Sequence, residues 1–284
     1  MATHRDGIPL PANILAVSVG AGAQRRKGRR RAAAPRALHG AARAGYALAM
    51  DLPTPLFPGT LLRRYKRFLA DVRLDDGAEV TAHVANPGSM LGLCEPGLRA
   101  WLSRATDPRR KLAYAWELVA ADGALVGINA SRPNALAAEA LDAGRIPELA
   151  GYPQRRREVK YGRNSRIDLL LGDPEAGRPD CYVEVKNVHL KRAPALAAFP
   201  DAVTARGAKH LEELGDMVEA GHRAAMLYVV QRGDCDRLTV AADIDPAYAR
   251  ALERAIARGV EVYAYACAVT HRAVAVDRRL PIAL

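Results

Sequence analysis

The pattern of hydrophobic positions divides the chain near residue 130. Between residues 56 and 129, short segments alternate polar and apolar positions or are rich in β-forming residues, and turn signals such as Asn86-Pro87-Gly88 separate them. These segments lie near residues 61–74, 79–84, 98–103, 112–119 and 124–129. Short strands at this spacing predict a small barrel, and we expect an OB-like β-barrel over residues 50–130.

Beyond residue 130 the pattern alternates between helices and strands. Segments 134–143, 201–220 and 246–258 predict helices, with Asp201 and Asp245 as the N-caps of the last two. The apolar segments 225–231 and 260–269 predict buried strands. This order predicts an α/β domain with a mixed central sheet over residues 131–284.

Residues 166–186 carry the most distinctive chemistry. Two apolar runs, RIDLLL and CYVEVK, flank a loop rich in Gly and Pro and predict a hairpin. Side chains alternate faces along a strand, so Glu184 and Lys186 share one face while Val185 points to the other. Asp168 interrupts the first run, and pairing of the two strands would bring it near Glu184 and Lys186.

Buried charges must be paired or bind a metal, and carboxylate oxygens suit Mg²⁺ or Mn²⁺. The positions resemble the catalytic pattern of the PD-(D/E)XK nucleases, with Asp168 on one strand and Glu184-Val185-Lys186 on the next. In a nuclease, Asp168, Glu184 and the Val185 carbonyl would hold the metal, and Lys186 would position water. Such enzymes often carry a further acid on an upstream helix, which makes Glu139 a candidate metal partner. The alternative is a half-buried salt bridge on a sheet face, with Glu139 as a surface acid.

The net charge of +11 suggests nucleic acid as a partner, but its distribution weakens that argument. Residues 1–49 hold nine Arg and Lys against one acid, so residues 50–284 carry only +3. We expect residues 1–49, rich in Ala, Arg and Gly, to form a disordered basic tail or a signal peptide, or to precede a true start at Met50. A DNA-binding function must therefore depend on local patches.

Two local patches could contact DNA. The first barrel segment, LLRRYKRFL, interleaves basic and aromatic residues, so Arg63, Arg64, Lys66 and Arg67 could meet phosphates. The helix at 201–220 carries the second patch, Arg206, Lys209 and His210. The alternatives are a solvated strand face and surface charge pairing on the helix. No base-reading motif stands out, so we expect binding to phosphates, largely without sequence preference.

Other classes of protein are disfavoured by the sequence. No run of about 18 or more apolar residues occurs, so we expect no membrane span. The four cysteines are widely spaced and form no CxxC pair, which argues against a zinc ribbon or a disulfide framework. We therefore expect a reduced, cytoplasmic protein.

Taken in order, several blocks after residue 56 resemble the sugar fermentation stimulation protein A family. The clearest are NPGSMLGLCEPG (86–97), REVKYGRNSRID (157–168), YVEVKNVHL (182–190) and FPDAVTARGAKHLEEL (199–214). The resemblance implies an OB-like domain, a PD-(D/E)XK nuclease-like domain, DNA binding and a role in regulating sugar (maltose) metabolism. It also implies a start near Met50, because family members typically begin a few residues before the PGT block at residues 58–60.

Two functional hypotheses follow from the residues and the resemblance together. In one, the protein is a DNA-binding regulator on a nuclease-like fold, which binds without needing a metal. In the other, it is a Mg²⁺-dependent nuclease in which Asp168, Glu184 and Lys186 are catalytic. Family resemblance cannot choose between them, because a fold does not fix a function.

Overall fold

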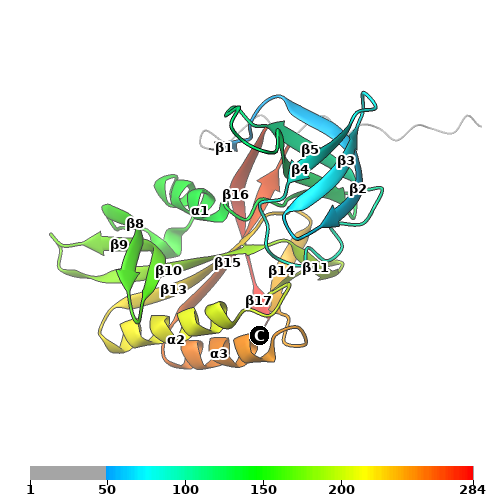
Figure 1. The fold of residues 1–284 in the computed structure, drawn as a ribbon. Helices are drawn as coiled ribbons and strands as arrows, with labels where there is room; N and C mark the ends of the chain where they lie inside the picture. Colours follow the sequence, from blue (N-terminus) through cyan, green and yellow to red (C-terminus); the bar gives the residue numbers. More distant parts are fainter. Residues whose placement is uncertain (1–48, 284) are drawn as a thin grey trace, which may run out of the picture. The chain divides into compact units, whose positions relative to one another are not determined.

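The computed structural model describes residues 49–283 (Figure 1). The interpretation of residues 1–49 as a tail, a signal peptide or an upstream segment lies, except for residue 49, outside the described residues. Among residues 49–283, no helix combines the length and the apolar character that crossing a membrane requires.

The N-terminal strands close into the predicted barrel. They are β2 (Leu56–Tyr65), β3 (Leu69–Leu74), β4 (Glu79–His83), β5 (Arg99–Arg104), β6 (Tyr114–Ala121) and β7 (Ala124–Gly127). Their order is β4-β3-β2-β5-β6-β7, and a parallel pairing of β4 with β6 closes a barrel of five strands, to which β7 adds a hairpin. Leu61, Leu102 and Trp116 fill the interior with fully buried side chains. The segment predicted at 61–74 is two strands, because Lys66 and Arg67 turn the chain in left-handed conformations.

The C-terminal domain is built on a mixed sheet, as predicted, and this sheet has seven strands. Its strands, in spatial order, are β1 (Met50–Asp51), β16 (Ala273–Leu280), β15 (Glu261–Val269), β13 (Arg223–Val230), β10 (Arg178–Val188), β9 (Ser165–Asp173) and β8 (Gln154–Tyr161). β10, β13 and β15 are parallel, and the remaining pairings are antiparallel. Because β1 pairs with β16, residues 50 and 51 join this sheet and not the barrel predicted for residues 50–130.

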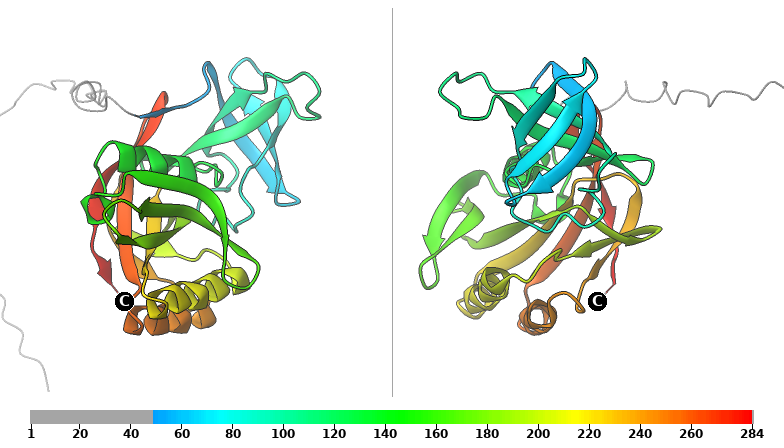
Figure 2. Two further views of the ribbon diagram at one scale, coloured as in Figure 1. Left: turned by 90° about the vertical axis from the view of Figure 1, so that its left-hand side faces the viewer. Right: turned by 45° about the vertical axis from the view of Figure 1, so that its right-hand side comes forward.

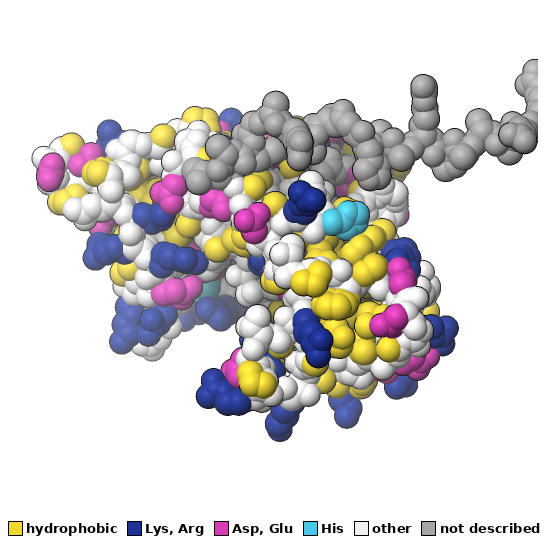
Figure 3. Space-filling view, turned by 90° about the horizontal axis from the view of Figure 1, so that it is seen from above, with side chains coloured by type: hydrophobic (Ala, Val, Ile, Leu, Met, Phe, Trp, Pro, Cys, Tyr) yellow, Lys and Arg dark blue, Asp and Glu magenta, His cyan; other side chains and the backbone are white. Residues whose placement is uncertain are grey.

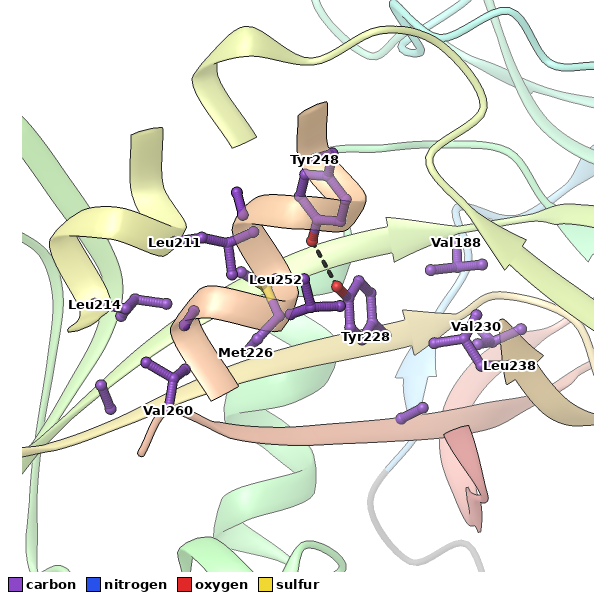
Figure 4. Packing of buried hydrophobic residues seen from close by; sticks show 14 of the residues in the cluster. Val188, Leu211, Leu214, Met226, Tyr228, Val230, Leu238, Tyr248, Leu252 and Val260 are labelled. Atoms are coloured by element: carbon purple, nitrogen blue, oxygen red, sulfur yellow. Dashed lines mark hydrogen bonds between the residues drawn. The ribbon is translucent and has the colours of Figure 1, made fainter. Parts of the chain in front are cut away.

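Helices cover both faces of this sheet (Figures 1 and 2). α2 (Ala205–Glu219) and α3 (Pro246–Ala257) lie on one face, where Leu211, Leu252 and Tyr248 pack against β13 (Figure 4). The Tyr248 and Tyr228 hydroxyls share a hydrogen bond of 2.5 Å there. α1 (Pro133–Asp142) and the 3-10 turn η1 (Pro147–Leu149) pack on the opposite face.

Two features differ from the sequence-based expectation. A small second sheet of β11 (Leu190–Ala193), β12 (Ala195–Phe199), β14 (Cys235–Val240) and β17 (Ile282–Ala283) was not predicted. The helix predicted to begin at Asp201 begins at residue 205, because the Thr204 hydroxyl caps it by accepting from the Gly207 N–H. Asp201 instead accepts a hydrogen bond from the backbone N–H of Met90 in the barrel.

Candidate nucleic-acid and metal site

Asp168 lies where β9 and β10 separate. Regular pairing of the two strands ends at Val183 and Leu169, one residue before Asp168 is reached. The Asp168 carboxylate enters the gap and accepts from the Val185 N–H at 2.7 Å. Burial, and then the charge of Glu184, raise the pKa of Asp168 to about 6. The strand pairing thus brings Asp168 to Glu184 and Lys186, which together we call the acid site.

Glu184 is buried and receives two charged or polar donors on a single oxygen. Lys186 Nζ donates to Glu184 Oε1 at 2.6 Å, and His210 Nδ1 contacts the same oxygen. Burial would raise the pKa of Glu184, but the His210 hydrogen bond and the Lys186 charge outweigh it and hold the pKa below its usual value. The other oxygen, Oε2, is buried and has no hydrogen-bond partner among the described residues.

The oxygens around the gap fit a hard cation. In an extended strand, N–H and C=O of one residue point to the same side, so the Val185 carbonyl faces the Asp168 side. Asp168, the unpartnered Oε2 of Glu184 and this carbonyl offer oxygen ligands only, as Mg²⁺, Mn²⁺ and Ca²⁺ prefer. Within residues 49–283, no three His, Cys, Asp or Glu side chains are grouped to hold a metal, so water or phosphate oxygens would have to complete the shell.

The structure places Glu139 elsewhere. α1 supplies Asn134 to the acid site, whose Nδ2 donates to Asp168 at 2.7 Å. Glu139 comes five residues later, about 140° round the helix, since each residue turns about 100°. Burial raises the pKa of Glu139, and the groups that affect it next are Arg145 and the Met50 backbone. The contacts therefore give no support to Glu139 as a metal partner.

α2 contributes residues to the site in two different ways. His210 is 3% exposed, so it contacts Glu184 in the interior and is not the surface phosphate contact that we predicted. Arg206 is exposed, and its Nε donates to His210 Nε2 at 3.2 Å. Lys209 donates to the Arg163 carbonyl at 2.7 Å and lies 3.5 Å from Glu213.

A pocket of about 280 Å³ brings these α2 residues together with the turn between β8 and β9. Its lining includes Arg166, Arg206 and Lys209 around His210, and we call it the cation pocket. Figure 3 shows Lys and Arg side chains, with Asp and Glu among them, both on the side where Figure 1 places β8 and β9 and around the barrel. The lining also includes Glu158, so three cations and one carboxylate lie beside the acid site, and the three cations are suited to a phosphate group.

Two buried residues near the site were missed by the sequence-based reasoning. Tyr161 and Glu213 each keep a buried oxygen that has no partner among the described residues. Burial raises the pKa of Tyr161, and the charges of Glu184 and Glu213 raise it further. Strand and helix periodicity place both residues on core-facing positions, where a sequence gives no sign of an unpaired polar atom.

The barrel arginines divide into structural and exposed groups. Arg63 pairs with Asp71 at 2.8 Å, and Arg64 donates to the backbone carbonyls of Asn86, Gly88 and Ser89. Arg64 thus holds a loop of the barrel and is not free to bind DNA as predicted. Lys66 and Arg67 are exposed, and their side chains have no ion pair or hydrogen bond within the described residues.

Comparisons with known proteins agree with this architecture. Residues 131–273 match the family described as "Sugar fermentation stimulation protein RE domain", and residues 62–128 match "SfsA N-terminal OB domain". A sugar fermentation stimulation protein homolog from Rhodospirillum centenum is 63% identical over 231 residues, which cover 81% of this chain and 98% of that protein. A homolog from Agrobacterium fabrum is 60% identical over 223 residues, covering 78% and 92%.

A solved structure extends the likeness to three dimensions. Pyrococcus furiosus SfsA in complex with Ca²⁺ is similar with a TM-score of 0.73 at 26% identity, over 84% of this chain and all of that one. Both domains of the fold are therefore those of that family, an OB barrel followed by a nuclease-like α/β domain. This chain belongs to the sugar fermentation stimulation protein (SfsA) family.

Proposed function

We propose that this protein binds DNA through backbone phosphates, largely without sequence preference, and that the binding serves the regulation of sugar (maltose) metabolism. The name that its relatives share, sugar fermentation stimulation protein homolog, supports the second part. The observation that carries the first part is the cation pocket, which opens beside the acid site. Phosphate oxygens prefer such charged donors, and contacts to them carry little sequence information.

A second function, hydrolysis of phosphodiester bonds, is favoured by the unpartnered oxygen of Glu184. Mg²⁺ or Mn²⁺ at the acid site would neutralise phosphate charge and lower the pKa of a bound water. The chain's own part would be to hold the ligands in place: Asn134 and the Val185 N–H fix Asp168, and Lys186 fixes Glu184. The Ca²⁺ bound in the P. furiosus relative supports a site for a hard cation.

One experiment separates the two functions. Labelled single- and double-stranded DNA would be incubated with the full chain in Mn²⁺, Mg²⁺ or EDTA, and binding and cleavage would be read from the same gel. A mobility shift in EDTA without cleavage in either metal identifies a DNA-binding protein. Cleavage that EDTA abolishes identifies a nuclease.

Two carboxylate variants make the result specific. Asp168→Ala removes a ligand from the acid site, while Asp180→Ala removes a partly exposed carboxylate from the same strand as Glu184. A nuclease loses cleavage only in Asp168→Ala, and a DNA-binding protein keeps its shift in both variants. Absence of both a shift and cleavage in the unmodified protein would contradict the two proposals and leave the acid site as a salt bridge in the sheet.

A further inference from the structure

The turn between β2 and β3 presents two cations and an aromatic ring to solvent. Lys66 and Arg67 adopt φ values of 49° and 62°, and both side chains are exposed. Phe68 follows with 45% of its surface exposed, although a ring of this size is normally buried in a barrel. In OB barrels, the loop between the first two strands is one of those that contact oligonucleotides.

This turn borders a pocket of about 350 Å³ formed by both domains. Arg67 and residues 86–88 line it from the barrel, while Asn187, His189 and residues 199–204 line it from the C-terminal domain. We call it the turn pocket. Val203, which is 74% exposed, lies on its lining, so an apolar side chain and Arg67 face the same space.

A directional set of hydrogen bonds holds the polar part of the turn pocket rigid. Gln231 Nε2 donates to Asn187 Oδ1 at 2.7 Å, and Asn187 Nδ2 then lies 3.1 Å from His189 Nδ1. Because Asn187 Nδ2 can only donate, His189 must donate from Nε2, which lies 3.2 Å from Asp201 Oδ2. The Met90 N–H also donates to Oδ2. Both of these hydrogen bonds therefore use the same oxygen, and Asp201 Oδ1 accepts none from another described residue.

The turn pocket and the acid site lie at the same end of α2. Thr204, the N-cap of this helix, lines the turn pocket, and Arg206 lines the cation pocket. His210, one helical turn later, contacts Glu184 in the acid site. A DNA strand that runs along the first turn of α2 would therefore pass from the turn pocket, by way of the cation pocket, to the acid site.

We propose that the turn pocket receives a base of single-stranded DNA, whose phosphates lie on Lys66 and Arg67 and continue to the cation pocket. This inference rests on the proposed DNA binding and adds the form of the DNA to it. A base needs an apolar surface for its face and fixed polar atoms for its edge, and Val203, Asn187 and Asp201 provide both. In duplex DNA the bases are stacked and paired, so none can enter such a pocket without being extruded.

The test compares two equivalent substitutions in the full chain. Val203→Asp places a charge on the pocket lining, and Leu91→Asp makes the same change at a leucine that is 47% exposed and does not line the pocket. Binding of a labelled 20-nucleotide single strand and of its duplex would be measured by fluorescence anisotropy, in EDTA, or in Ca²⁺ if the unmodified protein needs a cation.

We expect Val203→Asp to weaken single-strand binding about tenfold and to change duplex binding less than twofold. Leu91→Asp should change neither kind of binding. Phe68→Ala should also weaken single-strand binding selectively, because the exposed Phe68 ring, next to Arg67 in the chain, offers a surface on which a neighbouring base can stack. Equal effects of Val203→Asp and Leu91→Asp, or no effect of Val203→Asp, would overturn the turn pocket as a base site while leaving DNA binding intact. Failure of the unmodified protein to bind any DNA would overturn the proposed function itself.

Discussion

At the scale of single residues, Asp168 carries a charge that the fold disfavours. Its pKa is raised to about 6 by burial and by Glu184, whereas the ordinary value is 3.8. For an acid whose pKa is higher in the folded state, ionisation costs stability once the pH exceeds the unfolded pKa, and the cost is complete above the folded pKa. A shift of this size corresponds to a cost of about 3 kcal/mol at most.

We therefore expect Asp168→Asn to stabilise the protein by about 1–3 kcal/mol at pH 7.5 in EDTA. The new amide can still accept the Val185 N–H, and Asn134 can turn its own oxygen toward it. The gain should shrink as the pH falls from 6 toward 4, where the unmodified carboxyl becomes neutral. Urea unfolding at pH 7.5 and 4.5 measures it, and a loss of stability at pH 7.5 would contradict the electrostatic cause.

His210 gives a second prediction at this scale, because Arg206 determines which of its two ring nitrogens carries the proton. The Arg206 guanidinium can only donate, so His210 Nε2 accepts, and Nδ1–H must donate to Glu184. In His210→Asn the side-chain amide can occupy the Nδ1 position, whereas in His210→Gln it extends to the Nε2 position. We expect a loss of about 1 kcal/mol for Asn and about 3 kcal/mol for Gln, because the latter leaves a buried carboxylate short of a donor. Urea unfolding of both variants checks the order, and equal losses would contradict it.

The residues of the acid site could be predicted because strand alternation has a period of two. That rule placed Glu184 and Lys186 on one face and Asp168 on the neighbouring strand. Asn134 could not be predicted, because it arrives from a helix on the other side of the sheet, 34 residues away along the chain. Arg64 could not be recognised as structural either, because its acceptors are backbone carbonyls and carry no sequence signal.

At the scale of elements, local periodicity gave reliable predictions, whereas only one of the two predicted caps was correct and long-range pairing was missed. Asp245 and Pro246 begin α3 as expected, with Asp245 accepting from the Tyr248 N–H at 2.9 Å. The second sheet was missed because β12 is rich in alanine and its partner β14 lies about forty residues further along the chain. Asp201 was wrongly predicted as a cap, because its carboxylate accepts a hydrogen bond from the Met90 N–H of the barrel and not from the first turn of α2.

Asp245 also joins two elements, which predicts an unusually large effect of its removal. Besides capping α3, its other oxygen accepts from the Thr204 N–H at 2.7 Å, just before α2 begins. A cap alone contributes about 1 kcal/mol, and leaving a buried N–H unsatisfied costs about 1–3 kcal/mol more. We expect Asp245→Ala to cost about 2–4 kcal/mol in urea unfolding and Thr204→Ala, which removes only the α2 cap, about 1 kcal/mol. Similar losses in the two variants would contradict the linking role.

At the scale of the whole molecule, the proposed DNA binding would depend on the number of Lys and Arg side chains without a carboxylate partner and not on the net charge of +11. Each phosphate neutralised on a single strand contributes about 0.7 to the slope of log K against log salt. Arg63 and Lys66 are three residues apart in the same hairpin, yet only Arg63 is paired with a carboxylate. The two residues therefore provide a matched comparison between a cation that is engaged and one that is available.

We expect the combined change Lys66→Ala and Arg67→Ala to reduce the salt slope for single-stranded DNA by about 1.4, since two phosphate contacts are lost. Arg63→Ala should leave the slope unchanged within about 0.3, because Asp71 already neutralises this guanidinium at 2.8 Å. Anisotropy titrations of the full chain at several salt concentrations between about 50 and 200 mM would give the slope for each variant, because log K falls linearly with log salt in this range. Equal slopes for the unmodified protein and the double variant would show that the turn between β2 and β3 does not contact DNA phosphates. A reduced slope in Arg63→Ala would mean that DNA competes with Asp71 for the arginine, so that the barrel strand itself contacts the phosphates.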